Sequence, residues 1–320
     1  MNVLIWHVHG SWMTNFVQGE HTYVVPVVPG RGPDGRGRAR TWEWPASVVE
    51  VSPDDLADHP IDVAVVQRPE ELELVATWCR RVPGRDIPLV WLEHNAPQGR
   101  VNDMRHPACD RTDVIVVHVT HHNALFWDTG AARARVVEHG VIDPGRRWTG
   151  ERAVAAIAIN EPVRRGRVVG ADLFGRLAAA APIDLFGMGA RHMAMALGRP
   201  AWLGVHEDPP QHCLHEELAM RRCYVHPFRW TSLGLTLIEA MMLGMPVVAL
   251  ATTAVPIAVP QTCGIVSNDV DKLVEGIRTL VADSGLAASL GDAARTHAVE
   301  RFALDRFLTE WTEVLEEARS

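Results

Sequence analysis

The sequence predicts an α/β protein of two domains, each built on a parallel β-sheet. Short β-branched runs alternate with helix-like segments through most of the 320 residues. That alternation is typical of parallel sheets with helices on both faces. The segment DPGRRWTGERA, which follows Val141, is rich in Pro, Gly and charge, and we expect the interdomain linker there. The length is sufficient for two separate hydrophobic cores.

The first half contains five expected strands, at residues 3–8, 61–66, 87–92, 114–119 and 135–138. Helix-like segments separate some of them, at 70–81 and 122–128. The region 29–41 is rich in Gly, Pro and Arg and predicts a mobile loop. Ligands of open α/β sheets collect at the carboxyl ends of the strands. The polar segments WHVHGSW, QRPEE and EHNAPQGR are therefore the expected binding loops.

The second half repeats the strand and helix theme. Strands are expected at 155–159, 223–227 and 247–251, with a strand and glycine turn at 183–189 and a buried helix at 233–243. Gly244 and Pro246 stop that helix. The final stretch, RFALDRFLTEWTEVLEEARS, predicts an amphipathic terminal helix with its apolar residues on one side.

Composition narrows the class of protein. A net charge of −8 without a long basic tract gives no support to a nucleic-acid partner. The five cysteines are an odd number with no C-x-x-C spacing, which indicates free thiols in a reducing compartment. The start, MNVLIWHVHG, lacks a basic region, and its apolar run is too short for a signal peptide or a membrane span. We therefore expect a soluble cytoplasmic protein with no integral membrane segment.

One carboxylate stands out in the second half. Glu239 is the only carboxylate in residues 226–259, and burying it alone costs several kcal/mol unless a partner meets it. The expected helix presents unpaired amides at 232–235, where the macrodipole adds positive charge, and a diphosphate fits such an end. A ribose attached to that diphosphate would reach Glu239, about 7 Å away. The alternative is that an arginine pairs with Glu239 and only holds the fold together.

This segment resembles the nucleotide-sugar segment of family-four retaining glycosyltransferases of the GT-B fold. Their pattern is P-S-x-x-E-x-F-G-L-x-x-x-E-A-M-x-x-G-x-P-V-V-A. The residues in register are Pro227, Gly234, Leu235, Glu239, Ala240, Met241, Gly244, Pro246, Val247, Val248 and Ala249. The resemblance implies two Rossmann-like domains facing across a cleft. It implies an acceptor-binding domain at 1–148, to which a terminal helix at 303–320 returns, and a nucleotide-sugar donor-binding domain at 149–302.

The same resemblance assigns roles to the donor loop. The second glutamate of the family's E-x7-E pair holds the ribose diol, and Glu239 inherits that role. The first glutamate, which contacts the donor sugar, falls on Thr231, whose hydroxyl can hydrogen-bond but brings no charge. Leu233 stands where the family has Phe. The expected donor-binding residues of this loop are Thr231, Ser232, Leu233, Gly234 and Leu235.

A basic loop precedes this segment. NEPVRRGR occupies the place of the family's V-G-R-L-x-x-x-K-G, with Arg165 on the lysine and Asn160 where the family has arginine. The fork of Arg164 or Arg165 suits phosphate oxygens. The alternative is that these arginines form a solvated helix start. The turn IDLFGMG resembles the family's glycine turn, which adds Gly187 to the expected donor site.

Three residues of the first half complete the expected site. His94 sits where many family members have a histidine that contacts the donor sugar. Gly10 matches the family's Gly-rich first loop loosely, and its N–H is expected to approach the diphosphate or the acceptor. His9 is an alternative general base, because inverting enzymes of this fold place a histidine after the first strand and a neutral imidazole can take a proton. The competing interpretation of each histidine is a satisfied or exposed side chain.

Neither a metal nor a cofactor is expected. The histidines of HVTHHN follow a strand, and no carboxylate cluster joins them. No D-x-D-type motif stands at a strand end. The resemblance implies that helix amides and Arg165 stabilise the leaving diphosphate. It implies transfer of a hexose from a nucleoside-diphosphate sugar to a small-molecule or glycan hydroxyl, with retention, and assigns catalytic roles to His94, Arg165 and Glu239.

Two other functions remain open at this level. Because Thr231 and Asn160 replace charged family residues, the protein is alternatively a non-catalytic nucleotide-sugar-binding protein of the same fold. A nucleotide-sugar epimerase shares the architecture but uses several carboxylates around the anomeric carbon, and no such pair lies near Glu239 in the sequence. The donor base and sugar and the acceptor are not encoded in the motifs.

Overall fold

The structure, a computed structural model, describes residues 1–320 and divides into two compact units. The first unit comprises Met1–Gly140 with Leu304–Ser320, and the second comprises Val141–Ala303. Each unit contains one parallel sheet, so the predicted α/β architecture of two parallel-sheet domains is confirmed.

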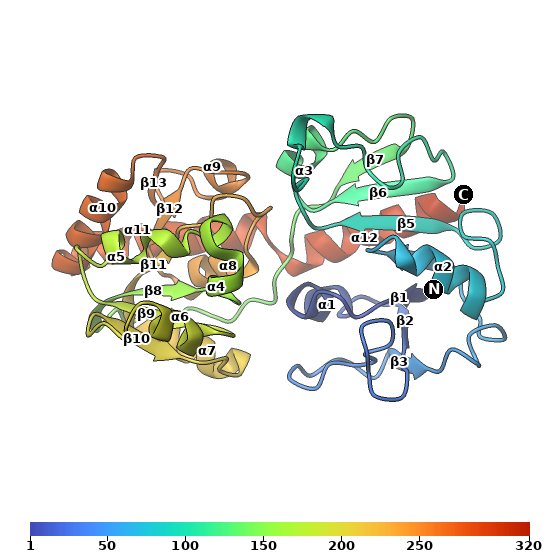
Figure 1. Ribbon diagram of the computed structural model, residues 1–320, viewed down its shortest axis with the longest axis horizontal. Helices are drawn as coiled ribbons and strands as arrows, with labels where there is room; N and C mark the ends of the chain where they lie inside the picture. The colour runs from blue at the N-terminus through green and yellow to red at the C-terminus, as the bar shows by residue number, and fades with distance from the viewer. The chain divides into compact units, whose positions relative to one another are not determined.

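The first unit has a seven-stranded sheet of order β3-β2-β1-β4-β5-β6-β7 (Figure 1). Its strands are β1 (Asn2–Ile5), β2 (Thr22–Pro26), β3 (Val48–Val51), β4 (Val63–Val66), β5 (Leu89–Glu93), β6 (Val114–His118) and β7 (Arg133–Val136). Its helices are α1 (Gly10–Phe16), α2 (Glu70–Trp78), the short η1 (Val101–Asp103), α3 (His121–Phe126) and α12 (Leu304–Arg319). The sequence analysis missed β2 and β3 and placed the last strand two residues too late.

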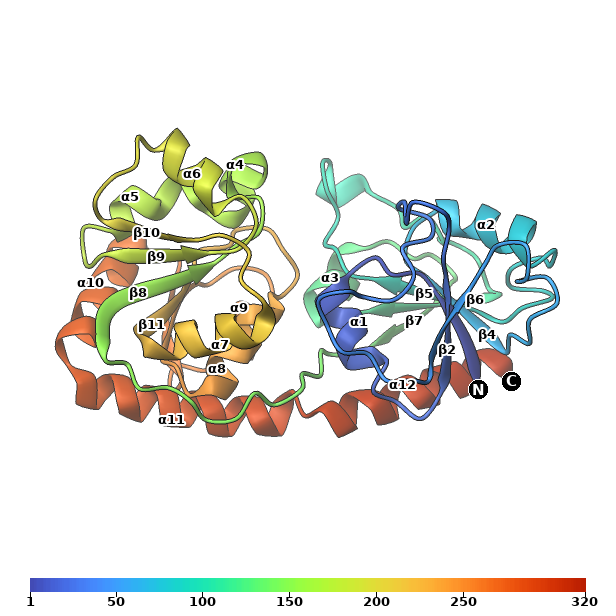
Figure 2. The same cartoon turned by 90° about the horizontal axis from the view of Figure 1, so that it is seen from below.

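The terminal helix belongs to the core of the first unit, as predicted. Phe307 and Trp311 of α12 pack edge-on against Trp12 of α1, with ring centroids 5.8 and 5.4 Å away. Helix α12 also contacts β4, β5 and β6, and Figure 2 shows it running beneath this sheet. Val75 and Cys79, at the opposite face, join the core formed with Trp6 and Trp91.

The segment expected to be mobile is instead organised by two arginines. Arg31 forms an ion pair with Glu50 at 2.7 Å. Arg38 donates to the carbonyl of Pro45 at 3.0 Å and to those of Trp44 and Val48. A Gly- and Pro-rich composition indicates an absence of regular secondary structure, but these arginines satisfy backbone carbonyls that a strand would otherwise pair.

The second unit has a six-stranded sheet of order β10-β9-β8-β11-β12-β13. Its strands are β8 (Arg152–Ala158), β9 (Ile183–Phe186), β10 (Leu203–His206), β11 (Arg221–His226), β12 (Val247–Leu250) and β13 (Gly264–Ser267). Its helices are α4 (Pro162–Arg165), η2 (Gly166–Val169), η3 (Ala171–Leu173), α5 (Phe174–Leu177), α6 (Ala190–Ala196), α7 (Gln211–Met220), α8 (Leu235–Leu243), α9 (Val255–Ala258), α10 (Val270–Ala282) and α11 (Ser284–Arg301). Helices α7 and α8 pack against each other and against β11.

The buried helix of the second unit begins later than predicted. We expected residues 233–243, whereas α8 spans Leu235–Leu243 with Gly234 as its N-cap. The amide of Leu237 donates to the carbonyl of Gly234 at 3.1 Å. The open helix amides therefore lie near 234–236 rather than at 232–235. No helix of the chain is both long enough and apolar enough to cross a membrane.

Candidate functional site

Glu239 is buried in the middle of α8, and two side chains of α7 meet its carboxylate. Its exposed fraction is 4%. Gln211 Nε2 donates to Oε1 at 3.1 Å, and His215 Nε2 lies 3.3 Å from Oε2. The arginine partner that the alternative interpretation required is absent from these contacts. The start of α8 and this carboxylate both lie in the second unit.

The loop from Pro227 to Gly234, which precedes α8, is fixed at several points. The amides of Arg229 and Trp230 both donate to the carbonyl of Val168, at 2.8 and 3.2 Å. Thr252 Oγ1 donates to the carbonyl of Phe228 at 2.6 Å. These bonds hold the loop in one conformation before a ligand binds, which limits the ordering cost of binding. Thr231 is half-buried in this loop, and Ser232 and Leu233 are buried.

A stack of rings lines the start of α8. The imidazole of His226 and the ring of Phe228 stack with centroids 4.2 Å apart. The guanidinium of Arg165 lies 5.7 Å from the centroid of Phe228. A Cβ on Gly234 would come within 2.9 Å of His226 Cε1, so only glycine lets the loop approach this ring without displacement.

The electrostatics of this stack favour an anion. Burial, and next the charge of Arg164, lower the pKa of the Arg165 guanidinium. Burial, and then the charge of Arg165, lower the pKa of His226 to about 3, so that His226 is neutral at pH 7. No carboxylate pairs with Arg165 in the structure. A half-buried guanidinium at the His226–Phe228 stack and the open amides at the start of α8 are both groups that can donate to an anion.

The neighbouring arginines are already engaged. Arg164 is exposed and lies 3.6 Å from Glu161. Arg167 and Arg229 both pair with Asp172, at 2.8 and 3.0 Å. Of the two arginines named from the sequence, Arg165 is therefore the one that is half-buried and has no carboxylate partner.

Asn160 and Gly187 belong to one tight turn after β8 and β9. Asn160 Oδ1 accepts from the amide of Met188 at 3.0 Å. Gly187 has φ +121, and a Cβ there would lie 2.5 Å from the carbonyl of Ile159, so the position requires glycine. Asn160 therefore anchors the turn through its oxygen, a use that the sequence did not reveal.

Glu207 caps the short helix that follows this turn. Its carboxylate accepts from the amides of Gly189 and Arg191 at 2.7 and 2.8 Å. These bonds, that of Arg191 first, hold the pKa of Glu207 below its usual value. The start of α6 is thus occupied by the chain's own carboxylate, whereas the start of α8 is not capped by a side chain.

In the first unit, the half-buried side chain of His94 lies beside His9. Their ring centroids are 4.0 Å apart. Gln67 donates through Nε2 to the carbonyl of Trp6 at 2.8 Å and turns its Oε1 to His94 Nε2 at 3.0 Å. Because Gln67 presents an acceptor, the proton of the neutral His94 ring resides on Nε2. Burial, and less so the charges of His9 and His139, lower the pKa of His94 well below its ordinary value.

His9, the alternative base named from the sequence, has a lowered pKa. Burial, and next the charge of Arg36, lower its pKa to about 4, and an efficient general base has a pKa near the working pH. Gly10, the first residue of α1, packs under the ring of Trp42, which a Cβ would approach to 2.5 Å. Its lack of a side chain thus serves packing.

Sequence reasoning missed Gln211, His215, His226 and Phe228. The spacing of Gln211 and His215, four residues apart in QHCLHEEL, places both on one face of a helix and was the available signal. Nothing in the sequence specified that this face meets α8. No group of three or more His, Cys, Asp or Glu side chains is arranged as a metal site.

Comparison with known proteins gives a fold, and a family match for one segment of the chain. Residues 192–297 match the family model "Glycosyl transferases group 1". No curated protein sequence matches the chain. Sucrose-phosphate synthase from Thermosynechococcus elongatus is a similar solved structure, with TM-score 0.73, 12% identity and coverage of 99% of this chain and 98% of that one. HepE of Anabaena, in complex with UDP-glucose, has TM-score 0.70 and 14% identity, covering 99% and 100%.

A longer protein also shares the fold. TarM of S. aureus, in a complex with UDP, has TM-score 0.61 and 14% identity and aligns with 79% of this chain. The chain spans 55% of the length of that structure.

The chain has the GT-B fold. It consists of two parallel-sheet units, and the second contains a buried carboxylate on helix α8, which begins after Gly234 and has no side-chain cap. The segment that matches the group 1 glycosyltransferase model contains both α7 and α8, and it includes residues of the segment whose sequence resembles family-four glycosyltransferases.

Proposed function

We propose that the protein transfers a hexose from a uridine-diphosphate sugar to a hydroxyl acceptor with retention of configuration. The second unit binds the donor, and the first unit binds a small-molecule or glycan acceptor. The observation that carries the proposal is the buried carboxylate of Glu239, held by Gln211 and His215 behind the open start of α8. The presence of UDP-glucose in the HepE complex supports the choice of donor class.

The diphosphate and the ribose of the donor are bound by different groups of the protein. The open amides near 234–236 and the guanidinium of Arg165 take the diphosphate. Glu239 accepts from the ribose hydroxyls. Thr231, in the loop that precedes α8, is proposed to hydrogen-bond the donor sugar in place of the family's first glutamate.

The chemistry needs no protein nucleophile. The bond between the anomeric carbon and the β-phosphate oxygen breaks, and the electron pair stays on the leaving UDP. The acceptor oxygen then bonds to the same face of the anomeric carbon, and its proton passes to the leaving phosphate oxygen. Arg165 and the α8 amides lower the barrier by stabilising charge that develops on the diphosphate. Within this scheme His94 is proposed to contact the donor sugar, and Gly10 and Asn160 to border it, while His9 is not required as a base.

Binding and turnover measurements test the proposal. UDP is expected to bind, measured by calorimetry, and Glu239→Ala is expected to weaken it about tenfold to a hundredfold, because hydrogen bonds to a charged group contribute about 1.5–3 kcal/mol. Slow release of UDP from UDP-glucose or another UDP-hexose without acceptor is expected of a transferase. Unchanged UDP affinity in the Glu239 variant contradicts the ribose assignment.

A second candidate function has its own support. Thr231 brings no charge to the donor sugar, and Asn160 is used to anchor the turn at Met188. A protein with these two replacements can bind a sugar nucleotide without turning it over. Binding of UDP-sugars with no release of UDP across a panel of sugars and acceptors would favour this non-catalytic function.

A further inference from the structure

Helix α7 brings one side chain to each oxygen of the Glu239 carboxylate: Gln211 donates a hydrogen bond to one oxygen, and His215 lies close to the other. Gln211 and His215 are four residues apart, so both project from the same face of the helix. Gln211 reaches Oε1 of Glu239 at 3.1 Å, and His215 reaches Oε2 at 3.3 Å. The side chains of His215 and Glu239 are exposed by only 10% and 5%. Each carboxylate oxygen is therefore approached by a different protein side chain.

The Glu239 carboxylate can still accept hydrogen bonds from a ligand. Each carboxylate oxygen has two lone-pair sites; Gln211 uses one on Oε1, and the His215 ring lies 3.3 Å from Oε2 without a hydrogen bond. The remaining directions suit two hydroxyl donors on adjacent carbons. Without α7, the three side-chain torsions of a glutamate would have to be ordered by the ligand itself, which costs binding free energy.

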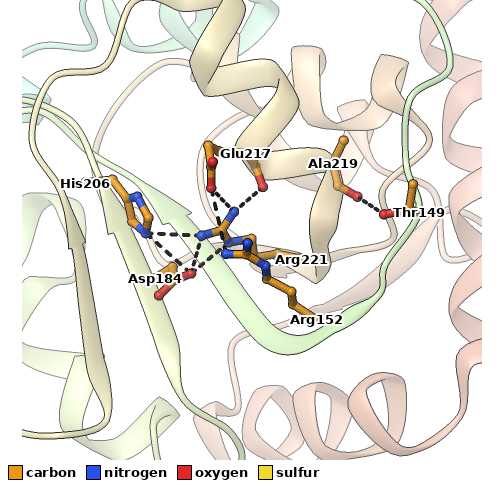
Figure 3. Close-up of polar contacts among 7 residues, drawn as sticks. All are labelled: Thr149, Arg152, Asp184, His206, Glu217, Ala219 and Arg221. Atoms are coloured by element: carbon orange, nitrogen blue, oxygen red, sulfur yellow. Dashed lines mark hydrogen bonds and ion pairs between the residues drawn. The ribbon is translucent and has the colours of Figure 1, made fainter.

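The far end of α7 is anchored by a buried ion network, shown in Figure 3. Arg221, the first residue of β11, is fully buried and donates to Asp184 through Nε at 2.7 Å. It also donates to the backbone carbonyl of Glu217 in α7 at 2.6 Å and pairs with the Glu217 carboxylate. His206 approaches the same guanidinium at 3.1 Å. Both ends of α7 are thus tied to the polar interior of the unit.

We propose that His215, assisted by Gln211, is a positioning residue that sets the orientation in which Glu239 accepts the pentose diol of the donor. This inference rests on the donor site proposed above. His215 does not touch the ligand; it acts through Glu239. The competing explanation is that His215 only offsets the cost of burying a carboxylate and has no influence on ligand choice.

A comparison of ligands separates the two explanations. UDP and 2′,3′-dideoxy-UDP differ only in the hydroxyls that Glu239 is proposed to bind. The ratio of their Kd values, measured by calorimetry, reports the diol contact alone. In the unmodified protein we expect UDP to bind at least about tenfold more tightly.

His215→Leu is expected to reduce that preference at least about fivefold while leaving the Kd of the dideoxy ligand within about twofold. His215→Gln, which retains an N–H donor, is expected to restore most of the preference. His212→Leu is the matched control, because His212 lies on the exposed face of the same helix. If His215→Leu fails to fold, Gln211→Leu tests the same idea with His215 in place. We expect it to reduce the UDP preference by a smaller factor.

Three results would overturn the inference. An equal loss of affinity for both ligands in His215→Leu would indicate a merely structural role. An unchanged Kd ratio in both His215→Leu and Gln211→Leu, with a reduced ratio in Glu239→Gln, removes the positioning role but keeps the ribose site. An unchanged ratio in Glu239→Gln removes the ribose assignment itself.

Discussion

The imidazole of His226 lies nearly parallel to the ring of Phe228, with 18° between their planes, and Gly234 passes directly beside it. This relationship decides how closely the loop before α8 can approach β11. Gly234 has an ordinary extended backbone with φ −77, so its requirement for glycine is one of space alone.

Gly234→Ala should therefore weaken UDP binding without unfolding the protein. The added Cβ would stand 2.9 Å from His226 Cε1, and the loop must move to relieve that contact. We expect a loss of about fivefold to tenfold in UDP affinity, of the order found when core sites are overpacked. Gly175→Ala is the control, since nothing lies within 4 Å of its would-be Cβ. Equal UDP affinities for the two variants would remove Gly234 from the site.

Arg165→Ala should reduce affinity for the diphosphate specifically. The guanidinium has no carboxylate partner and stacks near Phe228, and charged hydrogen bonds contribute about 1.5–3 kcal/mol. Calorimetry should show UDP binding weakened about tenfold to a hundredfold, with binding of uridine unchanged. Arg164→Ala, in which the lost side chain is exposed and close to Glu161, should have little effect. A stronger effect at Arg164 than at Arg165 would reverse the assignment.

Arg221→Met should destabilise the second unit. Removing the guanidinium leaves Asp184 half-buried without its main cationic partner, and breaking a buried pair in this way costs about 3–5 kcal/mol. Denaturant unfolding monitored by circular dichroism measures this loss. Asp184→Asn combined with Arg221→Met should recover part of it, because the stranded charge is then gone; failure of the double variant to recover stability would argue against the ion-pair explanation.

The same ion network should make the free energy of unfolding depend on pH in the acidic range. Burial acts to raise the pKa of Asp184, but the bonds from His206 and Arg221 outweigh it and the pKa lies below the ordinary 3.8. A lowered carboxyl pKa contributes stability that is present above pH ~4 and is lost as pH falls through the folded-state value. The unmodified protein should lose this contribution in denaturant unfolding below pH ~4. Arg221→Met should show a shallower loss over that range.

His118→Phe should keep or raise stability at pH 7.5. The ring of His118 is fully buried, and neither nitrogen has a hydrogen-bond partner, a situation that costs about 1–3 kcal/mol. Burial, and then the charge of His106, lower its pKa to about 4. Because the unfolded chain binds the proton near pH 6.5, stability should fall as pH drops from 6.5 to 4. Thermal melts should show a flatter decline for His118→Phe than for the exposed control His212→Phe.

Much of the second unit was predictable because its signals are local. Glu239 was identified as a carboxylate in an apolar run, and Gly244 and Pro246 ended the helix where the structure ends it. The partners of Glu239 were not predictable, because Gln211 and His215 reach it through the packing of α7 on α8. A pairing between helices leaves no mark in the periodicity of either one.

The first unit was harder to read. Strand β2, TYVVP, precedes the Gly- and Pro-rich region, and the strand that follows, β3, is only four residues long. The role of Arg38 in that region depends on carbonyls of residues seven and ten positions away along the chain. Composition indicates flexibility there because it does not record such tertiary bonds.

The placement of α12 has a consequence for biosynthesis. Trp12 and Phe16 meet Trp311 at ring-centroid distances of 5.4 and 5.0 Å, yet nearly three hundred residues separate them in the chain. A ribosome therefore completes the whole of the second unit before it supplies the helix that closes the first. Until then Trp12 and Phe16 lack the aromatic partner that covers them in the folded chain, and exposed apolar surface of this kind makes incompletely folded chains prone to aggregate.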